Sequence, residues 1–262
     1  MLSYQHAYHA GNLADLHKHA LLAAMLAYLA AKPKPMSYLE THAGRGLYDL
    51  AGSEAARTGE AAAGIERALA EGWLPAGHPL LAVLAAVRAR HGARSYPGSP
   101  LVAATLLRPG DRMDLAELHP AEAGALGRVL GNRARIHRED GFAMANRLCP
   151  PEPRRGLMLV DPSWEVKADY DRVPGFVARI ARKWGVGVIA LWYPILGDGR
   201  HRPMLEALAT ALPGALRSEV CFPPAREGHG MTGSGLFVLN PPWGTAEAAR
   251  EIEAMFKARV PA

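Results

Sequence analysis

The chain has 262 residues, 49% of them hydrophobic, which is enough to bury a substantial core and excludes a disordered protein. Its 30 Lys and Arg residues against 25 Asp and Glu give a net charge of +5, which is compatible with a polyanionic partner without establishing one. Its two cysteines, Cys149 and Cys221, exclude a disulfide framework and a four-cysteine metal site, so we expect a reducing, cytoplasmic location.

The first predicted element is a helix over residues 14–31, which Pro33 and Pro35 would end. Its apolar second half, residues 20–31, is similar to a secretory signal. However, a long polar segment containing Asp15 precedes it, unlike a compact basic leader, and the run is too short to cross a bilayer. We therefore expect neither export nor a membrane partner.

Short apolar runs alternate with helical ones along the rest of the chain, a pattern typical of a parallel sheet with crossover helices. Strands are expected at residues 36–39, 113–116, 134–137, 157–160, 186–192, 220–223 and 235–239. The segment between the first two strands is far longer than the ~10–15 residues that one crossover helix needs. Helical patterns at residues 53–69 and 78–90 predict a small helical insertion subdomain over residues 53–98, within a single domain spanning residues 1–262.

Four successive predicted strands end in residues suited to a nucleoside. Gly44 and Gly46 follow the first strand, where glycines let the backbone turn sharply and approach a ligand closely. Glu117 follows the second strand, where a carboxylate can hold two ribose hydroxyls. Asp140 follows the third, positioned for an adenine amine, with Phe142 near enough to stack. A nucleoside-containing cofactor along the carboxyl edge of the sheet explains this set.

The fourth strand, residues 157–160, runs into Asp161-Pro162-Ser163-Trp164. An acid, a proline carbonyl and a large aromatic side by side can grip the exocyclic amine of a nucleobase. The tetrapeptide therefore predicts an amino-group methyltransferase in which the Asp161 carboxylate and the Pro162 carbonyl accept the two N–H bonds of the amine. Trp164 would stack on the target base, which must first leave its helix or loop.

Two further strings compete with this interpretation. Gly228-x-Gly230-x-x-Gly233 matches the dinucleotide fingerprint, but it precedes a strand and opens no helix, so we interpret it as a loop. Asn240-Pro241-Pro242-Trp243 fits the amine-binding pattern more fully than residues 161–164, yet it follows the last strand of the series. It is interpreted as a rigid strand terminator and kept as an alternative catalytic loop.

The N-terminus is rich in histidine, and His6 and His9 have the spacing of metal ligands. No acid or cysteine completes a plausible site nearby, so no metal is expected. Together with Tyr4, Tyr8 and Lys18, these histidines suit contact with RNA, because aromatic rings stack on unpaired bases and cations meet phosphate. Plain surface or capping histidines remain the alternative.

The chain resembles the RlmJ family of large-subunit ribosomal RNA adenine N6-methyltransferases in motifs that cover nearly its whole length. These motifs are Met1-Leu2-Ser3-Tyr4, His6, His9-Ala10-Gly11-Asn12, Lys18-His19, Thr41-His42-Ala43-Gly44, Arg57-Thr58-Gly59-Glu60, Tyr96-Pro97-Gly98-Ser99-Pro100, Glu117-Leu118-His119-Pro120, Asp140-Gly141, Leu191-Trp192-Tyr193-Pro194 and Asn240-Pro241-Pro242-Trp243. The resemblance implies an α/β, class I Rossmann-like methyltransferase fold with a mostly parallel seven-stranded sheet, S-adenosylmethionine as cofactor and one specific adenine of 23S ribosomal RNA as target.

The resemblance also implies roles for individual residues. The catalytic acid would be Asp161, and the RNA-contacting tyrosine would be Tyr4, to which the pattern of the N-terminus adds His6 and Lys18 as RNA contacts. Ser163 replaces the second proline of the family's Asp-Pro-Pro-aromatic loop, which puts loop rigidity in question more than chemistry. Adding Gly44 from the strand-end pattern, cofactor contacts would fall on His19, His42, Gly44, Ser99, Glu117, Asp140, Gly141 and Asp161.

Two other functions fit the same sequence. A DNA adenine N6-methyltransferase needs the same active loop, and Ser163 leaves open a non-catalytic RNA-binding protein. For the ribosomal RNA methyltransferase we expect a monomer acting on protein-free or early-assembly 23S ribosomal RNA.

Overall fold

The computed structural model describes residues 6–225, 228 and 230–260. Within these ranges seven strands form one sheet in the order β5-β4-β1-β6-β7-β9-β8. β9 runs antiparallel to both neighbours, whereas the other paired strands are parallel. This confirms the expected class I methyltransferase fold, whose strand order reverses between β1 and β6, where such sheets bind ligands. The strands are β1 Ser37–Glu40, β4 Arg112–Ala116, β5 Arg135–His137, β6 Gly156–Val160, β7 Val188–Leu196, β8 Leu216–Cys221 and β9 Met231–Leu239.

The first four predicted strands agree with the structure within a residue or two, whereas the last three differ more. β7 extends to Leu196, β8 begins at Leu216, and β9 begins at Met231. The cause is the antiparallel ladder, which pairs β9 with β7 from Leu239 opposite Ile189 to Met231 opposite Leu196. These backbone hydrogen bonds continue beyond the apolar runs from which the strands were predicted.

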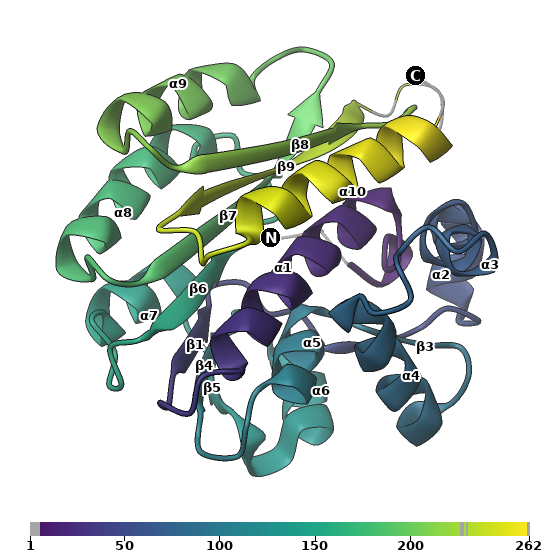
Figure 1. Cartoon of the computed structure of the whole chain (residues 1–262), viewed down its shortest axis with the longest axis horizontal. Coiled ribbons are helices and arrows are strands. Elements are labelled where there is room, and N and C mark those ends of the chain that lie inside the picture. The colour runs from purple at the N-terminus through teal and green to yellow at the C-terminus, as the bar shows by residue number, and fades with distance from the viewer. Residues whose placement is uncertain (1–5, 226–227, 229, 261–262) are drawn as a thin grey trace.

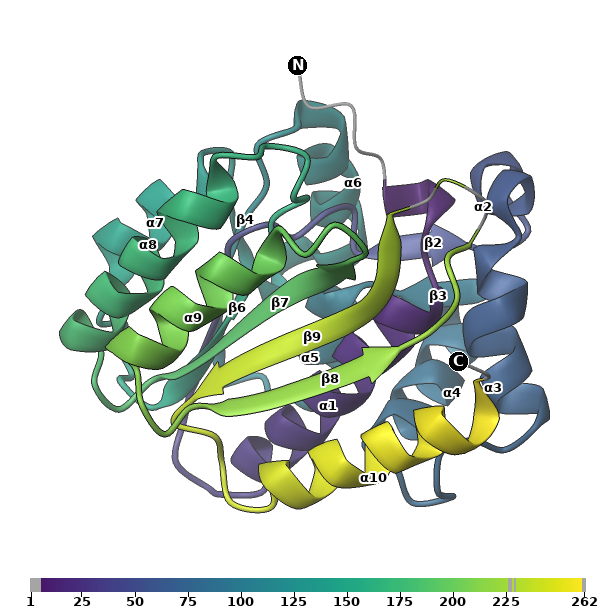
Figure 2. The same ribbon diagram turned by 90° about the horizontal axis from the view of Figure 1, so that it is seen from above.

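Helices cover both faces of the sheet (Figures 1 and 2). One face carries α1 Leu13–Ala30, α5 Ser99–Leu106, α6 Pro120–Leu130 and α10 Thr245–Arg259. The other carries α7 Gly141–Leu148, α8 Asp169–Lys183 and α9 His201–Ala211. α1 confirms the helix expected at residues 14–31. No helix in the described ranges combines the length and the apolar character that a membrane span requires.

Side chains alternate between the two faces of each strand, so every central strand contributes to two cores. On β6, Leu157 and Leu159 join the core that contains α1, whereas Met158 and Val160 join the core that contains α8. The same alternation, continued one step beyond the strand, turns Asp161 toward α1. The catalytic tetrapeptide therefore begins beside the first helix of the chain.

The segment expected to be a helical insertion lies at one side of the sheet in Figure 1. The predicted helix over residues 53–69 is broken into three pieces, because Gly59 adopts a left-handed conformation with φ of 66° and Gly64 a non-helical one with φ of −96° and ψ of −110°. Two three-residue strands, too short to give a readable pattern, pair antiparallel at the base of the segment. Its elements are α2 Ser53–Thr58, η2 Ala62–Glu66, α3 Arg67–Ala70, α4 Pro79–His91 and β3 Ser95–Pro97, and β2 Leu47–Asp49 precedes it. Among the described residues, two further short turns of helix are η1 His6–Tyr8 and η3 Gly131–Arg133.

Candidate active site

A cavity of about 630 Å³ opens at the carboxyl edge of the parallel strands. Because these strands end at the same edge, residues far apart in the sequence meet there. The cavity is lined by most of the predicted site residues that the structure describes: His6, Lys18, His19, His42, Gly44, Ser99, Glu117, Asp140, Gly141, Asp161, Pro162 and Trp164. Gly46 of the predicted cofactor turn and Tyr8 of the predicted RNA-contacting set do not line it. Tyr4 lies outside the described residues.

A buried ion-pair cluster forms the centre of the site. The Lys18 ammonium lies 2.7 Å from Asp161 Oδ2 and 3.1 Å from Asp15 Oδ1, and its side chain is 6% exposed. Burial alone would lower the pKa of Lys18, but the two carboxylates outweigh it and raise that pKa, so the ammonium stays charged. Lys18 was predicted to contact RNA; its position deep in the cavity means that only a base inserted there could reach it.

Two histidines of the predicted cofactor set are held uncharged. His19 Nδ1 lies 2.8 Å from the Tyr96 hydroxyl, and burial lowers the pKa of His19 to about 3. His42 Nδ1 lies 2.8 Å from the Thr41 hydroxyl, and burial lowers the pKa of His42 to about 4. At neutral pH both imidazoles are neutral, so neither would repel a cationic ligand.

Glu117 and Asp140 are oriented by backbone donors. The Glu117 carboxylate accepts the N–H groups of Gly44 at 2.8 Å and of His119 at 2.7 Å. Asp140 accepts the N–H of Ala143 at 2.8 Å and thereby caps α7. A carboxylate has about four acceptor positions, so each acid retains capacity for a ligand.

Phe142 was expected to stack on an adenine, but its ring is 2% exposed. It packs against Phe176, with ring centroids 4.6 Å apart, and the Arg172 guanidinium lies 4.4 Å from its centroid. These two neighbours cover much of the ring and leave little of it for a cofactor to stack on. Stacking of Phe142 on an adenine stays a prediction.

Trp164 was expected to stack on the target base, and its ring is also largely buried. It is 6% exposed and packs against Tyr170, with ring centroids 4.7 Å apart. Trp164 Nε1 and the Tyr170 hydroxyl are buried and have no hydrogen-bond partner among the described residues. Both residues line the cavity, so these two polar groups are suited to a ligand that supplies partners.

Sequence reasoning missed three residues of the site. Asp15 and Trp192 line the cavity, and Glu40 ends β1 fully buried behind Ser99. The Glu40 carboxylate accepts hydrogen bonds from the hydroxyls of Ser99 and Tyr38, yet burial raises the pKa of Glu40 to about 8. The strand-end argument used for Glu117 would have found Glu40. Asp15 lies within a helix, where nothing in the local pattern shows that it faces a site.

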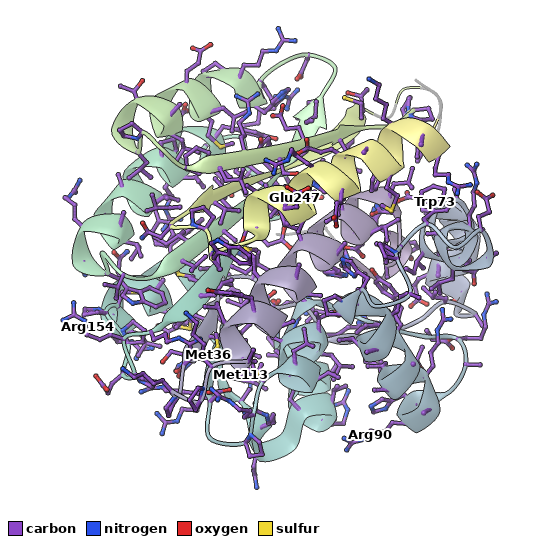
Figure 3. The ribbon with its side chains drawn as sticks, in the orientation of Figure 1. Met36, Trp73, Arg90, Met113, Arg154 and Glu247 are labelled. Atoms are coloured by element: carbon purple, nitrogen blue, oxygen red, sulfur yellow. The ribbon has the colours of Figure 1, made fainter. Side chains whose placement is uncertain are left out.

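The alternative loop Asn240-Pro241-Pro242-Trp243 lies at the opposite edge of the sheet. β9 is antiparallel, so it ends beside the amino end of β7, where Asn240 Nδ2 donates to the Gly187 carbonyl at 2.9 Å. That edge is marked in Figure 3 by Met36 and Met113, near the amino ends of β1 and β4. None of the four loop residues lines the cavity. This position disfavours the alternative and fits a strand terminator.

The sequence of the chain matches a known family over most of its length. The family described as ribosomal RNA large subunit methyltransferase D, RlmJ, matches residues 33–261. The chain belongs to this family. It is 42% identical over 249 residues to ribosomal RNA large subunit methyltransferase J of Escherichia coli, covering 93% of this chain and 88% of that one. It is 37% identical to the protein of the same name from Haemophilus influenzae, covering 96% and 92% of the two chains.

A solved structure agrees with the fold. The chain is similar to protein LPL1258 from Legionella pneumophila, with 33% identity and a TM-score of 0.86, covering 96% of this chain and 94% of that one. Membership of the RlmJ family confirms the resemblance found in the motifs and makes the chain a member of a methyltransferase family.

Proposed function

We propose that the protein transfers a methyl group from S-adenosylmethionine to N6 of one adenine in 23S ribosomal RNA. The observation that carries this proposal is the position of Asp161 and Pro162, where β6 opens into the cavity that most of the described cofactor candidates line. Membership of the RlmJ family supports the choice of substrate. We further propose a cytoplasmic monomer that acts on protein-free or early-assembly RNA, with residues 53–98 as an insertion subdomain.

The polar side chains of the cavity suit S-adenosylmethionine, which supplies an electrophilic methyl group on a sulfonium sulfur. Glu117 would bind the ribose hydroxyls, and Asp140 would accept the adenine amine. The neutral imidazoles of His19 and His42 fit beside a positive charge. Gly141 fits because a Cβ there would meet the Thr41 carbonyl oxygen at 1.8 Å, so the chain passes close to β1 where only glycine is possible.

On the substrate side, the residues of the active loop would prepare the target amine. The N6 lone pair of adenine is delocalised into the ring, which makes the amine a poor nucleophile. The Asp161 carboxylate and the Pro162 carbonyl would accept its two N–H bonds, localise the lone pair and aim it at the methyl group. The bond between carbon and sulfur would break as the N–C bond forms, leaving a neutral thioether, and the methylated amine would then lose one N–H proton to water. Lys18 keeps the carboxylate in place through its contact with Oδ2. Orientation of this kind can lower a barrier by ~7–11 kcal/mol.

The test replaces Asp161 by asparagine, which keeps the shape of the side chain but weakens its acceptor and removes its charge. Methyl transfer to ribosomal RNA should fall by ~10²-fold or more, because a misplaced amine loses its near-attack geometry. Calorimetry should show that the cofactor still binds, with a loss of affinity of about tenfold at most, because Asp161 is only one of the expected cofactor contacts. Asp171→Asn is the matched control, since Asp171 is an exposed acid of α8 outside the cavity. Near-wild-type turnover by Asp161→Asn would refute the assignment.

Two rival functions make different predictions for the same assay. A DNA adenine N6-methyltransferase would label duplex DNA and leave unmodified ribosomal RNA unlabelled. A non-catalytic RNA-binding protein, suggested by Ser163, would bind RNA but show no heat of cofactor binding. Offering free 23S ribosomal RNA and assembling particles separately tests the proposed RNA state, and sedimentation tests the proposed monomer.

A further inference from the structure

A row of polar side chains crosses the sheet beneath α1. Alternation along the strands turns Trp192 of β7, Ser234 of β9 and Ser218 of β8 toward this helix, beside the residues of the α1 core. His17 of α1 lies between the two serines, with Nδ1 2.9 Å from Ser234 Oγ and Nε2 3.1 Å from Ser218 Oγ. His17 and both serines are fully buried.

The row continues at both ends. Trp192, on the cavity side, donates its Nε1–H to Ser234 Oγ at 2.9 Å. Ser218, at the other end, donates its hydroxyl to Glu253 Oε1 of α10 at 2.6 Å. α10 and α1 lie side by side over these strands (Figures 1 and 2). Four hydrogen bonds therefore link a carboxylate on α10 to an aromatic wall of the cavity.

The two ends give the chain one direction. An indole N–H can only donate, and Glu253 Oε1 accepts the hydroxyl proton of Ser218. Ser218 gives its proton to Glu253 and must accept from His17, which places the imidazole proton on Nε2. The free Nδ1 then accepts from Ser234, whose oxygen accepts from Trp192. Burial lowers the pKa of His17 to about 3, so the imidazole is neutral as this arrangement requires.

The Trp192 end of this row of hydrogen bonds contacts the ion-pair cluster of Lys18 and Asp161. Trp192 is half-buried and lines the cavity, and the Lys18 ammonium lies 5.3 Å from the centre of its ring. The same ammonium binds Asp161 at 2.7 Å. A rotation of the Trp192 ring would therefore displace Lys18 and, through it, the carboxylate.

We propose that His17 is a positioning residue for methyl transfer: through Ser234 it fixes the Trp192 ring against Lys18, and so fixes Asp161 for the target amine. The proposal rests on the proposed function, because it assigns Asp161 the role given above. His17 itself neither lines the cavity nor contacts the reacting atoms. Its neighbour on α1, Lys18, makes the direct contact with Asp161.

The first test examines the hydrogen bonds from Glu253 to Trp192 by heteronuclear NMR of the wild-type protein and its variants. The imidazole of His17 should carry its proton on Nε2. The indole N–H resonance of Trp192, assigned through Trp192→Phe, should move in Ser234→Ala and in Glu253→Ala. It should stay in place in Ser37→Ala, which removes an equally buried serine hydroxyl, bonded to the Pro153 carbonyl, from β1. A proton on Nδ1, or an unmoved indole resonance in both variants, overturns the proposal.

The second test measures turnover. Ser234→Ala should lower kcat on ribosomal RNA by about three- to tenfold, the range expected from one hydrogen bond, with cofactor affinity unchanged. Glu253→Ala should lower kcat in the same direction, and Glu253→Gln, which still accepts from Ser218, should restore it. These variants avoid truncating His17, whose loss could unfold the protein.

The outcomes separate this proposal from the proposed function. Equal kcat in Ser234→Ala and Ser37→Ala overturns the role of His17 even if the wild-type protein methylates ribosomal RNA. If the wild-type protein transfers no methyl group to that RNA, the proposed function fails. The NMR measurements then still decide whether His17 sets the orientation of Trp192.

Discussion

Ser163 lies where the resemblance found in the sequence leads us to expect a second proline. It lies between Pro162, whose carbonyl is assigned to the target amine, and Trp164, which adopts a left-handed conformation with φ of 59°. The loop is fixed at its start by the contact of Asp161 with Lys18 and at its end by the packing of Trp164 on Tyr170. Tertiary contacts thus supply order that a second proline would otherwise provide.

We expect Ser163→Pro to change stability more than rate. A proline at a compatible position restricts the unfolded chain and stabilises the fold by about 0.4–1 kcal/mol. Because the loop is already fixed at both ends, kcat should stay within about twofold of wild type, a change far smaller than misplacement of a reacting group causes. Urea unfolding and single-turnover kinetics measure the two effects, with Ser163→Ala as the control for loss of the hydroxyl. A tenfold faster Ser163→Pro would show instead that loop rigidity limits the natural enzyme.

At the scale of elements, the carboxyl ends of the parallel strands were predictable and the role of α1 was not. Predicted strands followed by Glu117, Asp140 or Asp161 signal a site because parallel strands end at one edge. α1 was recognised as a helix, but helical periodicity does not distinguish a solvated polar position from one facing a cavity. Asp15, Lys18 and His19 are buried only because α1 packs across the sheet. The burial of these three residues, like the pairing of the short strands β2 and β3, depends on tertiary contacts and leaves little signal in the local sequence.

The start of α1 is itself held by η2 of the inserted segment. Asn12 caps α1 by accepting the Asp15 N–H at 2.8 Å, and the Ile65 N–H donates to the Gly11 carbonyl at 2.8 Å. Gly64 packs so closely here that a Cβ would lie 2.2 Å from the Gly11 oxygen. The inserted segment therefore stabilises the turn from which α1 extends into the active site.

We expect Gly64→Ala to damage both stability and activity. The added methyl must push η2 away from the helix cap, and overpacking of this kind typically costs about 1–3 kcal/mol. Because the displaced turn leads into the Asp15 and Lys18 cluster, the KM for RNA should also rise. Thermal unfolding and steady-state kinetics test this against Gly77→Ala, where a Cβ would enter open space. Equal melting temperatures for the two variants would mean that the contact does not hold the segment in place.

At the scale of the whole molecule, buried titratable groups make stability depend on pH in two opposite directions. Burial lowers the pKa of His17 and His19 to about 3 and of His42 to about 4. The stability that these neutral histidines contribute is complete above 6.5, their pKa in the unfolded chain, and is lost as the pH falls. Burial raises the pKa of Glu40 from 4.5 to about 8, so its contribution is complete below 4.5 and is lost as the pH rises to 8. The unfolded histidines are half-protonated at pH 6.5 and almost neutral by pH 7.5, so Glu40 dominates the set only from pH 7.5 upward.

Glu40→Gln should therefore make the free energy of unfolding depend less on pH on the alkaline side of neutrality. For wild type, the folded state binds up to one more proton than the unfolded state, and the free energy of unfolding should fall by roughly 0.8 kcal/mol from pH 7.5 to 9. Glutamine can still accept from Tyr38 but cannot ionise, so urea unfolding of this variant should change little across the same range. Glu247→Gln is the matched control, because Glu247 is an exposed acid of α10, labelled in Figure 3. It should retain the wild-type slope, and an equally steep slope in Glu40→Gln would show that Glu40 is ionised in the folded protein already at pH 7.5.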